Sequence, residues 1–292
     1  MSIQVIINPQ AGKREGEKLF PLIKRNLKNL GLAVEIAISN QPQEALRLAF
    51  QALEKGKEII LACGGDGTIH SLLPALAYKP AILAILPLGT ANDLARHWRI
   101  PLNLNLALQL LTHGQPKLVD LIVTKSGGYI GGSAGLGFDV AVIERVLSWR
   151  RYWRGIFPFL PAIMVEFLNY SLPIFSLTTD NWHYQGPAWQ IILSKMNQYA
   201  WCVKIPAHVQ YADGLMHMSL IPNIPKNKIL PKAFLLPFGG IKCIPQAQHL
   251  STSKISVASW PPCKYHGDGE IMGSTPETFQ VLPQALRILS PP

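Results

Sequence analysis

The sequence predicts two domains: an α/β domain built on a parallel sheet, followed by a mostly-β domain. Three observations support this fold class. The chain has 292 residues, which corresponds to about two domains at roughly 150 residues each. Its first 120 or so residues alternate β-rich runs with helical periods. After about residue 122 the helical periods fade, and short apolar runs separated by Gly, Pro and Asn take their place.

The first half gives the clearer pattern. Apolar residues recur at helical spacing in 17–30, which ends at Gly31, and in 42–55, which ends at Gly56. Short β-rich runs predict strands at 3–7, 33–38, 58–63 and 82–86. Strands that alternate with helices of this length are typical of a parallel sheet covered by helices. We therefore place the first domain at 1–122.

The second domain is placed at 123–272. Strand-like runs occur at 189–193, 216–221 and 254–258. Only 139–147 and the aromatic region after it have a helical pattern. No internal repeat is found.

Composition excludes several classes of protein. Hydrophobic residues make up 48% and charged residues 15%, whereas disordered chains combine low hydrophobicity with high charge. No apolar run reaches the roughly 18 residues of a membrane span, and the N-terminus lacks the basic region of a secretory signal. The four cysteines have neither zinc-site nor disulfide-framework spacing, so we expect a cytoplasmic protein. The net charge of +10 leaves nucleic acid, a membrane surface or phosphorylated ligands as partners.

The sharpest motif is Gly64-Gly65-Asp66-Gly67-Thr68, between an apolar strand and a helical segment. Glycines let the backbone approach a ligand closely, and a helix N-terminus attracts phosphate. Asp66 could bind Mg²⁺ or accept a proton from an attacking hydroxyl. The structural alternative is a tight turn with Asp66 as helix cap.

Two further loops follow predicted strands in the same way. One is the segment PLGTANDLAR at 87–96, and the other is NPQAGKR at 8–14. In open α/β sheets, ligands bind beyond the carboxyl ends of the strands, so these loops indicate one shared site. The chain contains no GxxxxGK[ST] motif and no GxGxxG after its first strand, which argues against a P-loop ATPase and a dinucleotide-binding domain.

Together the NPQAG start, GGDGT and PLGTANDLAR resemble the diacylglycerol kinase catalytic-domain family in its compact bacterial form, related to sphingosine kinases. Gly137-Phe138-Asp139, Asp213-Gly214-Leu215 and Asp268-Gly269-Glu270 follow in the family's order. The resemblance implies an N-terminal domain like that of NAD kinase and phosphofructokinase and a C-terminal β-sandwich, with the site between them. It also implies that 273–292 returns to the first domain, and that ATP, with Mg²⁺, phosphorylates the hydroxyl of diacylglycerol or a similar lipid alcohol.

The resemblance also implies roles for individual residues. The catalytic carboxylates would be among Asp66, Asp268 and Glu270, with Glu270 the usual base. A structural Mg²⁺ would be held by Asp213 and the backbone carbonyls of Gln210 and Leu215. The nucleotide would lie against Asn8, Gly12, Lys13, Ser39, Gly64, Gly65, Asp66, Gly67, Thr68, His70, Thr90 and Asn92.

The chain departs from the family pattern at several positions. His70 and Ser71 replace the usual Asn and Glu after GGDGT, and Ala212 replaces the first of two aspartates before Gly214. The lost charge at Ala212 puts occupancy of the structural metal site in question. Two alternatives therefore remain open: a soluble NAD kinase-like enzyme, and a lipid- or nucleotide-binding protein without activity.

Charge and aromatic residues concentrate in the second domain. Residues 145–264 contain 12 Lys and Arg against 3 Asp and Glu, which gives +9 of the total +10. Trp149-Arg150-Arg151-Tyr152-Trp153-Arg154 fits either a membrane interface or a solvated helix packed through its Trp residues. The apolar run 157–175 fits either an acyl pocket or core. We expect peripheral association with an anionic bilayer and no nucleic-acid partner; the lipid and the oligomeric state are not specified by the sequence.

Overall fold

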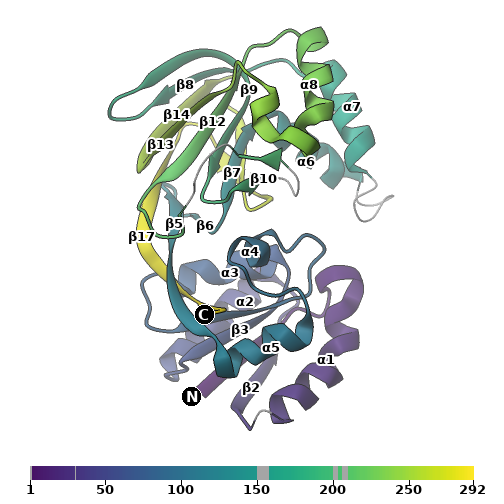
Figure 1. The fold of residues 1–292 in the computed structure, drawn as a ribbon, viewed down its shortest axis with the longest axis vertical. Coiled ribbons are helices and arrows are strands. Elements are labelled where there is room, and N and C mark those ends of the chain that lie inside the picture. The colour runs from purple at the N-terminus through teal and green to yellow at the C-terminus, as the bar shows by residue number, and fades with distance from the viewer. Residues whose placement is uncertain (1, 30, 150–157, 200–202, 206–209) are drawn as a thin grey trace.

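The computed structural model describes residues 2–29, 31–149, 158–199, 203–205 and 210–292. The side chains of 13–17 are also outside the described part, as is most of the Trp/Arg segment at 149–154. Two lobes are visible in Figure 1, a helix-covered α/β lobe and a mostly-β lobe with helices on one side. The predicted fold class is confirmed.

The first lobe has a sheet of order β2-β1-β3-β4-β17, in which each pair of neighbours is parallel. The strands are β1 (Ser2–Ile7), β2 (Ala33–Ile38), β3 (Ile59–Gly64), β4 (Ile82–Pro87) and β17 (Glu277–Ser290). The helices are α1 (Ala11–Asn29), α2 (Pro42–Glu54), α3 (Asp66–Leu76), α4 (Asp93–His97) and α5 (Leu104–His113).

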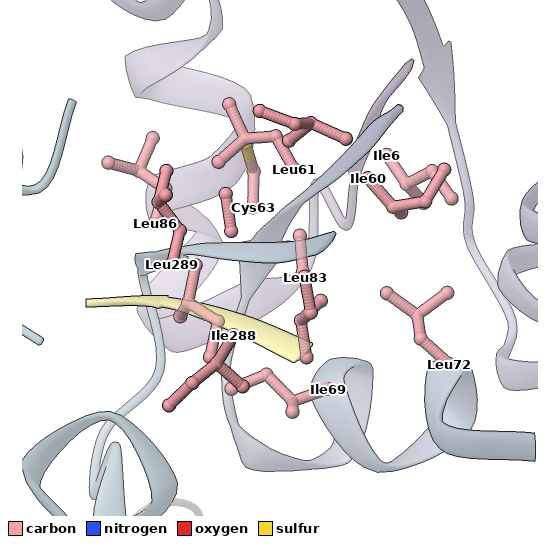
Figure 2. Close-up of a cluster of buried hydrophobic side chains, with 14 of the residues drawn as sticks. Ile6, Ile60, Leu61, Cys63, Ile69, Leu72, Leu83, Leu86, Ile288 and Leu289 are labelled. Carbon is pink, nitrogen blue, oxygen red and sulfur yellow. The ribbon is translucent and has the colours of Figure 1, made fainter. Parts of the chain in front are cut away.

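Helices on both faces bury the central strands completely. Every residue of β3 is buried, as expected for a parallel strand covered on both sides. Figure 2 shows how side chains from β3, β4, α3 and the end of β17 meet in this core, among them Cys63, Ile69 and Leu289. Helix α1 begins six residues before the predicted start because its first turns are charged or glycine and carry no apolar period.

The second lobe is antiparallel. Its strands are β6 (Tyr129–Ile130), β7 (Ser133–Gly137), β8 (Ile174–Thr178), β9 (His183–Ser194), β10 (Gln198–Tyr199), β11 (Val203–Lys204), β12 (Met216–Pro222), β13 (Gln248–Thr252), β14 (Lys254–Trp260), β15 (Lys264–Gly267) and β16 (Glu270–Ser274). Its helices are α6 (Phe138–Trp149), α7 (Phe159–Asn169) and α8 (Lys226–Gly239), followed by the 3₁₀ turn η1 (Gly240–Cys243). Helix α8 was not predicted, because Pro231 and Pro237 interrupt its pattern.

Two long strands pass between the lobes, β5 (Gln115–Thr124) and β17 (Figure 1). They pair with each other along most of their length. The start of β17 pairs with β14 in the second lobe, and its end pairs with β4 in the first. None of the helices in the described ranges is long and apolar enough to cross a membrane.

Candidate active site between the lobes

The loops that follow β3 and β4 meet at one edge of the parallel sheet. The Leu88 N–H donates to the Gly64 carbonyl at 2.9 Å. A Cβ on Gly89 would lie 2.5 Å from Gly65 Cα, so only glycine allows this approach. Asn92, in the left-handed region at φ 53°, closes the second loop by pairing its amide with the backbone of Gly89.

The loop after β1 joins the same edge. Asn8 donates through Nδ2 to Thr68 Oγ1 at 3.2 Å, which ties the first loop to the first turn of α3. The Thr68 side chain fills the space beside Gly64, where any Cβ would clash. The first N–H groups of a helix have no intrahelical partner, so the start of α3 presents donors where the three loops converge.

Asp66 caps the short helix α4. Its two carboxylate oxygens accept from the backbone N–H groups of Leu94 at 3.0 Å and Asp93 at 3.1 Å. Burial raises the pKa of Asp66, and the nearby charge of Asp268 adds to this, while the hydrogen bonds from Leu94 and Asp93 oppose it. Burial and the charge of Asp66 raise the pKa of Asp93 to about 6. The sequence analysis did not select Asp93, although it lies within the PLGTANDLAR motif.

Asp268 is held by the backbone of the second lobe. Its carboxylate accepts from the N–H groups of Gly131, Gly132 and Ser133 at 2.7, 2.8 and 3.0 Å. His70 Nδ1 lies 3.2 Å from the same carboxylate. Burial would raise the pKa of Asp268, but the hydrogen bond and charge of His70 and the backbone donors outweigh it and lower the pKa. Asp268 therefore fixes its hairpin to both lobes.

Glu270 differs from the other two carboxylates because it is exposed. Its Oε1 lies 3.2 Å from the position that a Cβ on Gly67 would take, at the start of α3. Among the described residues, its carboxylate makes no hydrogen bond or ion pair. Burial lowers the pKa of His70, but the hydrogen bond and charge of Asp268, with the charge of Glu270, outweigh this and raise it. Asp66 and Asp268, by contrast, are both held by backbone N–H groups.

The remaining residues predicted for the nucleotide site differ in their surroundings. Ser39 lies buried at the end of β2 and donates its hydroxyl to the Gln41 carbonyl at 2.8 Å. Thr90 is exposed on the loop after β4, and Gly12 lies at the start of α1 with φ 61°. The side chain of Lys13 is outside the described part of the chain. His70 points to Asp268.

The expected structural-metal site holds a lysine side chain. Lys195 Nζ lies 2.6 Å from Asp213 Oδ1 and 2.6 Å from the Leu215 carbonyl, two of the three groups expected to hold Mg²⁺. Mg²⁺ binds oxygen at about 2.1 Å, so a Mg²⁺ on the side of these two oxygens that Lys195 occupies would overlap the ammonium group. With Lys195 in place, this donor set does not fit a metal ion.

A deep apolar cavity of about 600 Å³ opens beside the carboxylates. Asp66, Asp93 and Asp268 line one part of it, and apolar side chains from α6, α7, α8 and β9 line the rest. Phe159, Ile163 and Phe167, which recur every four residues along α7, contribute to its wall. The run 157–175 thus supplies cavity lining as well as core.

One polar cluster lines this cavity. Tyr199 donates its hydroxyl to Asp139, and His266 Nε2 lies 2.8 Å from the Tyr199 hydroxyl and 2.9 Å from Asp139 Oδ2. Gly135 leaves the space that these three side chains occupy, since its Cβ would clash with all of them. His266 lies in β15, two residues before Asp268, and is buried.

Comparison with known proteins agrees with this architecture. Residues 2–124 match the model of the diacylglycerol kinase catalytic domain, and 132–290 match the YegS C-terminal NAD kinase beta sandwich-like domain. A protein named diacylglycerol kinase from Staphylococcus saprophyticus is 24% identical over 99% of this chain and 95% of its own length. A probable lipid kinase YegS-like from Klebsiella pneumoniae is 25% identical over 91% of this chain and 89% of its own.

A solved structure shares the fold. It is described as a putative diacylglycerol kinase from Bacillus anthracis and superimposes with a TM-score of 0.79 at 19% identity, over all of this chain and 95% of that one. The two domain matches lie in the same order as the two lobes and together span almost the whole chain. The chain therefore belongs to the diacylglycerol kinase family of bacterial lipid kinases.

Proposed function

We propose that this protein transfers the γ-phosphoryl group of ATP to the hydroxyl of diacylglycerol or a similar lipid alcohol. The observation that carries the proposal is the cavity: a largely apolar volume of about 600 Å³ that ends at a cluster of carboxylates beside the glycine-rich loops. Pockets of this size accommodate ligands the size of a drug molecule or a lipid segment. An apolar tail in the cavity would place a hydroxyl near the phosphate-binding loops.

The carboxylates divide the work in this proposal. Glu270, exposed and beside the start of α3, takes the proton of the lipid hydroxyl as general base. Asp66, at the end of the loop after β3, binds the first turn of α4 and so holds the loop after β4 in place. Asp268 positions Glu270 by anchoring the hairpin to 131–133 and His70. The N–H groups at the start of α3 bind phosphate oxygens.

The carboxylates of Asp66 and Asp93 could bind the Mg²⁺ that accompanies the nucleotide. Asp66 and Asp93 lie close enough for the charge of one to raise the pKa of the other, and a cation would relieve this repulsion. Mg²⁺ prefers such carboxylate oxygens together with substrate phosphates. When bound, it would neutralise charge on the phosphates during transfer.

The second lobe faces an anionic bilayer in this proposal. Large apolar side chains are exposed on α7 and α8, with Leu160, Leu168, Phe234 and Phe238 between 63% and 82% accessible. Lys226, Lys228 and Lys242 are exposed on or beside α8. The inner side of the same helices lines the cavity, so a membrane-bound α7–α8 surface would set the cavity next to its lipid.

The test is phosphoryl transfer from labelled ATP with Mg²⁺ to a panel of acceptors: diacylglycerol, monoacylglycerol, ceramide, sphingoid base, phosphatidylglycerol, undecaprenol and NAD. We expect labelling of at least one lipid alcohol and a loss of about 100-fold or more in Glu270→Gln. Labelling of NAD alone would instead make the protein an NAD kinase. ATP binding without transfer to any acceptor would make it a binding protein, and either result rejects the proposal.

A further inference from the structure

Lys195 is the only lysine or arginine that is buried among the residues described. It is 1% exposed and lies on the loop that follows β9. Its Nζ contacts three oxygens: Asp213 Oδ1 at 2.6 Å, the Leu215 carbonyl at 2.6 Å and Asp120 Oδ2 at 2.8 Å. An ammonium has three donors, and each one has an oxygen acceptor here. The group is therefore fully satisfied.

The acceptors come from separate parts of the chain. Asp120 lies in β5, and its carboxylate also accepts from the N–H groups of Gly214 and Gln284, both at 2.8 Å. Gln284 lies in β17, where the pairing with β5 shifts register between Leu282 and Leu286. The lysine cluster thus joins the loop after β9, the loop before β12 and the two strands that connect the lobes.

The cluster also reaches the active-site side of the first lobe. The Tyr211 carbonyl accepts from the Asp120 N–H at 2.7 Å, and the Tyr211 hydroxyl donates to the His97 carbonyl at 3.0 Å. His97 ends α4, the helix that Asp66 caps. One chain of contacts therefore runs from Lys195 through Asp120 and Tyr211 to α4.

We infer that the ammonium group of Lys195 is a built-in replacement for a structural divalent cation. Two carboxylates and a backbone carbonyl form an oxygen set of the kind that Mg²⁺ or Ca²⁺ binds, and here a covalently attached cation fills its centre. The connection between the lobes then needs no metal from solution.

The replacement also accounts for the missing acidic residue at Ala212. A divalent ion requires about two negative charges from its site for neutrality, whereas an ammonium requires one. Asp120 and Asp213 already supply two, so a further carboxylate at 212 would add repulsion rather than binding. The ammonium of Lys195 therefore needs no carboxylate at position 212.

The experiment compares Lys195→Ala with wild type, both freed of divalent ions and without nucleotide or lipid. Removing the ammonium leaves Asp120 and Asp213 unpaired and opens room for an ion. We expect the melting temperature of Lys195→Ala to fall by roughly 10 °C and to recover by at least half in millimolar Mg²⁺. Titration with Mn²⁺, followed by electron paramagnetic resonance, should show one site more than in wild type.

Two controls make the result specific. Lys195→Met keeps the bulk of the side chain without its charge, so it should be destabilised and should not recover in Mg²⁺. Lys195→Ala with Asp213→Asn should lose the added Mn²⁺ site. None of these measurements depends on kinase activity, so their outcome is independent of the proposed function.

Two results would overturn the inference. One is a folded Lys195→Ala that gains neither stability in Mg²⁺ nor a Mn²⁺ site. The other is a Mn²⁺ site in wild type that disappears in Asp213→Asn, because a metal would then bind beside the lysine. If Lys195→Ala and Lys195→Met do not fold, the wild-type titration alone decides.

Discussion

Gly65 and Gly89 bring the loops after β3 and β4 into backbone contact. A Cβ on Gly89 would lie 2.5 Å from Gly65 Cα and 2.7 Å from Asn92 Oδ1. Neither of these atoms can move without opening the loop, because Gly65 precedes α3 and Asn92 holds Gly89 through two hydrogen bonds. The contact makes one surface from two separate motifs.

Gly89→Ala should therefore disrupt nucleotide binding. We expect a fall in ATP affinity of at least 10-fold by calorimetry, with a modest drop in melting temperature, because the loops must separate. Gly186→Ala is the matched control, since its Cβ would meet only the movable end of Tyr184, at 3.1 Å. Equal ATP affinity in Gly89→Ala and wild type would show that this contact is not needed.

Asp268 and Glu270 should respond differently to loss of charge. Asp268→Asn presents an amide to backbone donors that need an acceptor, so we expect a loss of about 2–3 kcal/mol in the free energy of unfolding. Glu270→Gln should leave unfolding nearly unchanged while abolishing transfer. Urea denaturation of both variants separates the two roles. A destabilised Glu270→Gln with normal transfer would reverse our assignment.

His97 should make the protein less stable in mild acid. Burial, with the charge of Lys195, lowers the pKa of His97 to about 4, against about 6.5 in an unfolded chain. The folded state favours the neutral ring. The contribution of His97 to the free energy of unfolding is therefore complete above pH 6.5 and declines as pH falls from 6.5 towards 4. Between pH 7 and 5 the loss attributable to His97 is about 2 kcal/mol.

His97→Phe keeps a ring at this position and removes its titration. Between pH 7 and 5, the free energy of unfolding of this variant should fall by about 2 kcal/mol less than that of wild type. If the free energy of unfolding changed with pH in the same way in both proteins, the lowered pKa of His97 would be contradicted.

Filling the cavity should change lipid use without affecting ATP. Ile163 lines the cavity from α7, so Ile163→Trp reduces its volume. We expect the KM for long-chain lipid to rise about 10-fold or more, with the KM for ATP unchanged. Leu106→Trp in α5 of the first lobe is the control, because Leu106 is 51% exposed and is not part of the lining. Equal effects of both variants would place the lipid elsewhere.

Binding to anionic vesicles should depend on α8 and on salt. Replacing Phe234 and Phe238 by Ser removes the two most exposed apolar side chains of this helix, and we expect sedimentation with phosphatidylglycerol vesicles to fall about 10-fold. Binding of wild type should also weaken as salt rises. Leu106→Ser is the control, because this residue is 51% exposed and lies in α5 of the first lobe. Salt-independent binding, or none, would leave the basic charge of the second lobe unexplained.

Local sequence determined much of the first lobe. The runs 3–7, 33–38, 58–63 and 82–86 each lie in a strand within a residue of the prediction. Strands β1, β3 and β4 are almost wholly buried and are therefore mainly apolar, whereas the edge strand β2 is half-exposed. The glycine loops after β3 and β4 could be located for the same reason: each follows such a run and precedes a helix. Helix α8 could not be predicted, since its prolines disturb the pattern and its position depends on the cavity that it covers.

Tertiary structure alone decided what the polar residues do. By residue type Asp66, Asp268 and Glu270 were equivalent carboxylates, and only the family resemblance singled out Glu270. In the structure, backbone donors of 93–94 bind Asp66 and those of 131–133 bind Asp268. Lys195, 75 residues from Asp120, carried no local signal. Its burial is possible only because folding brings three oxygens from distant segments around one ammonium, and such long-range compensation of charge has no sequence period to reveal it.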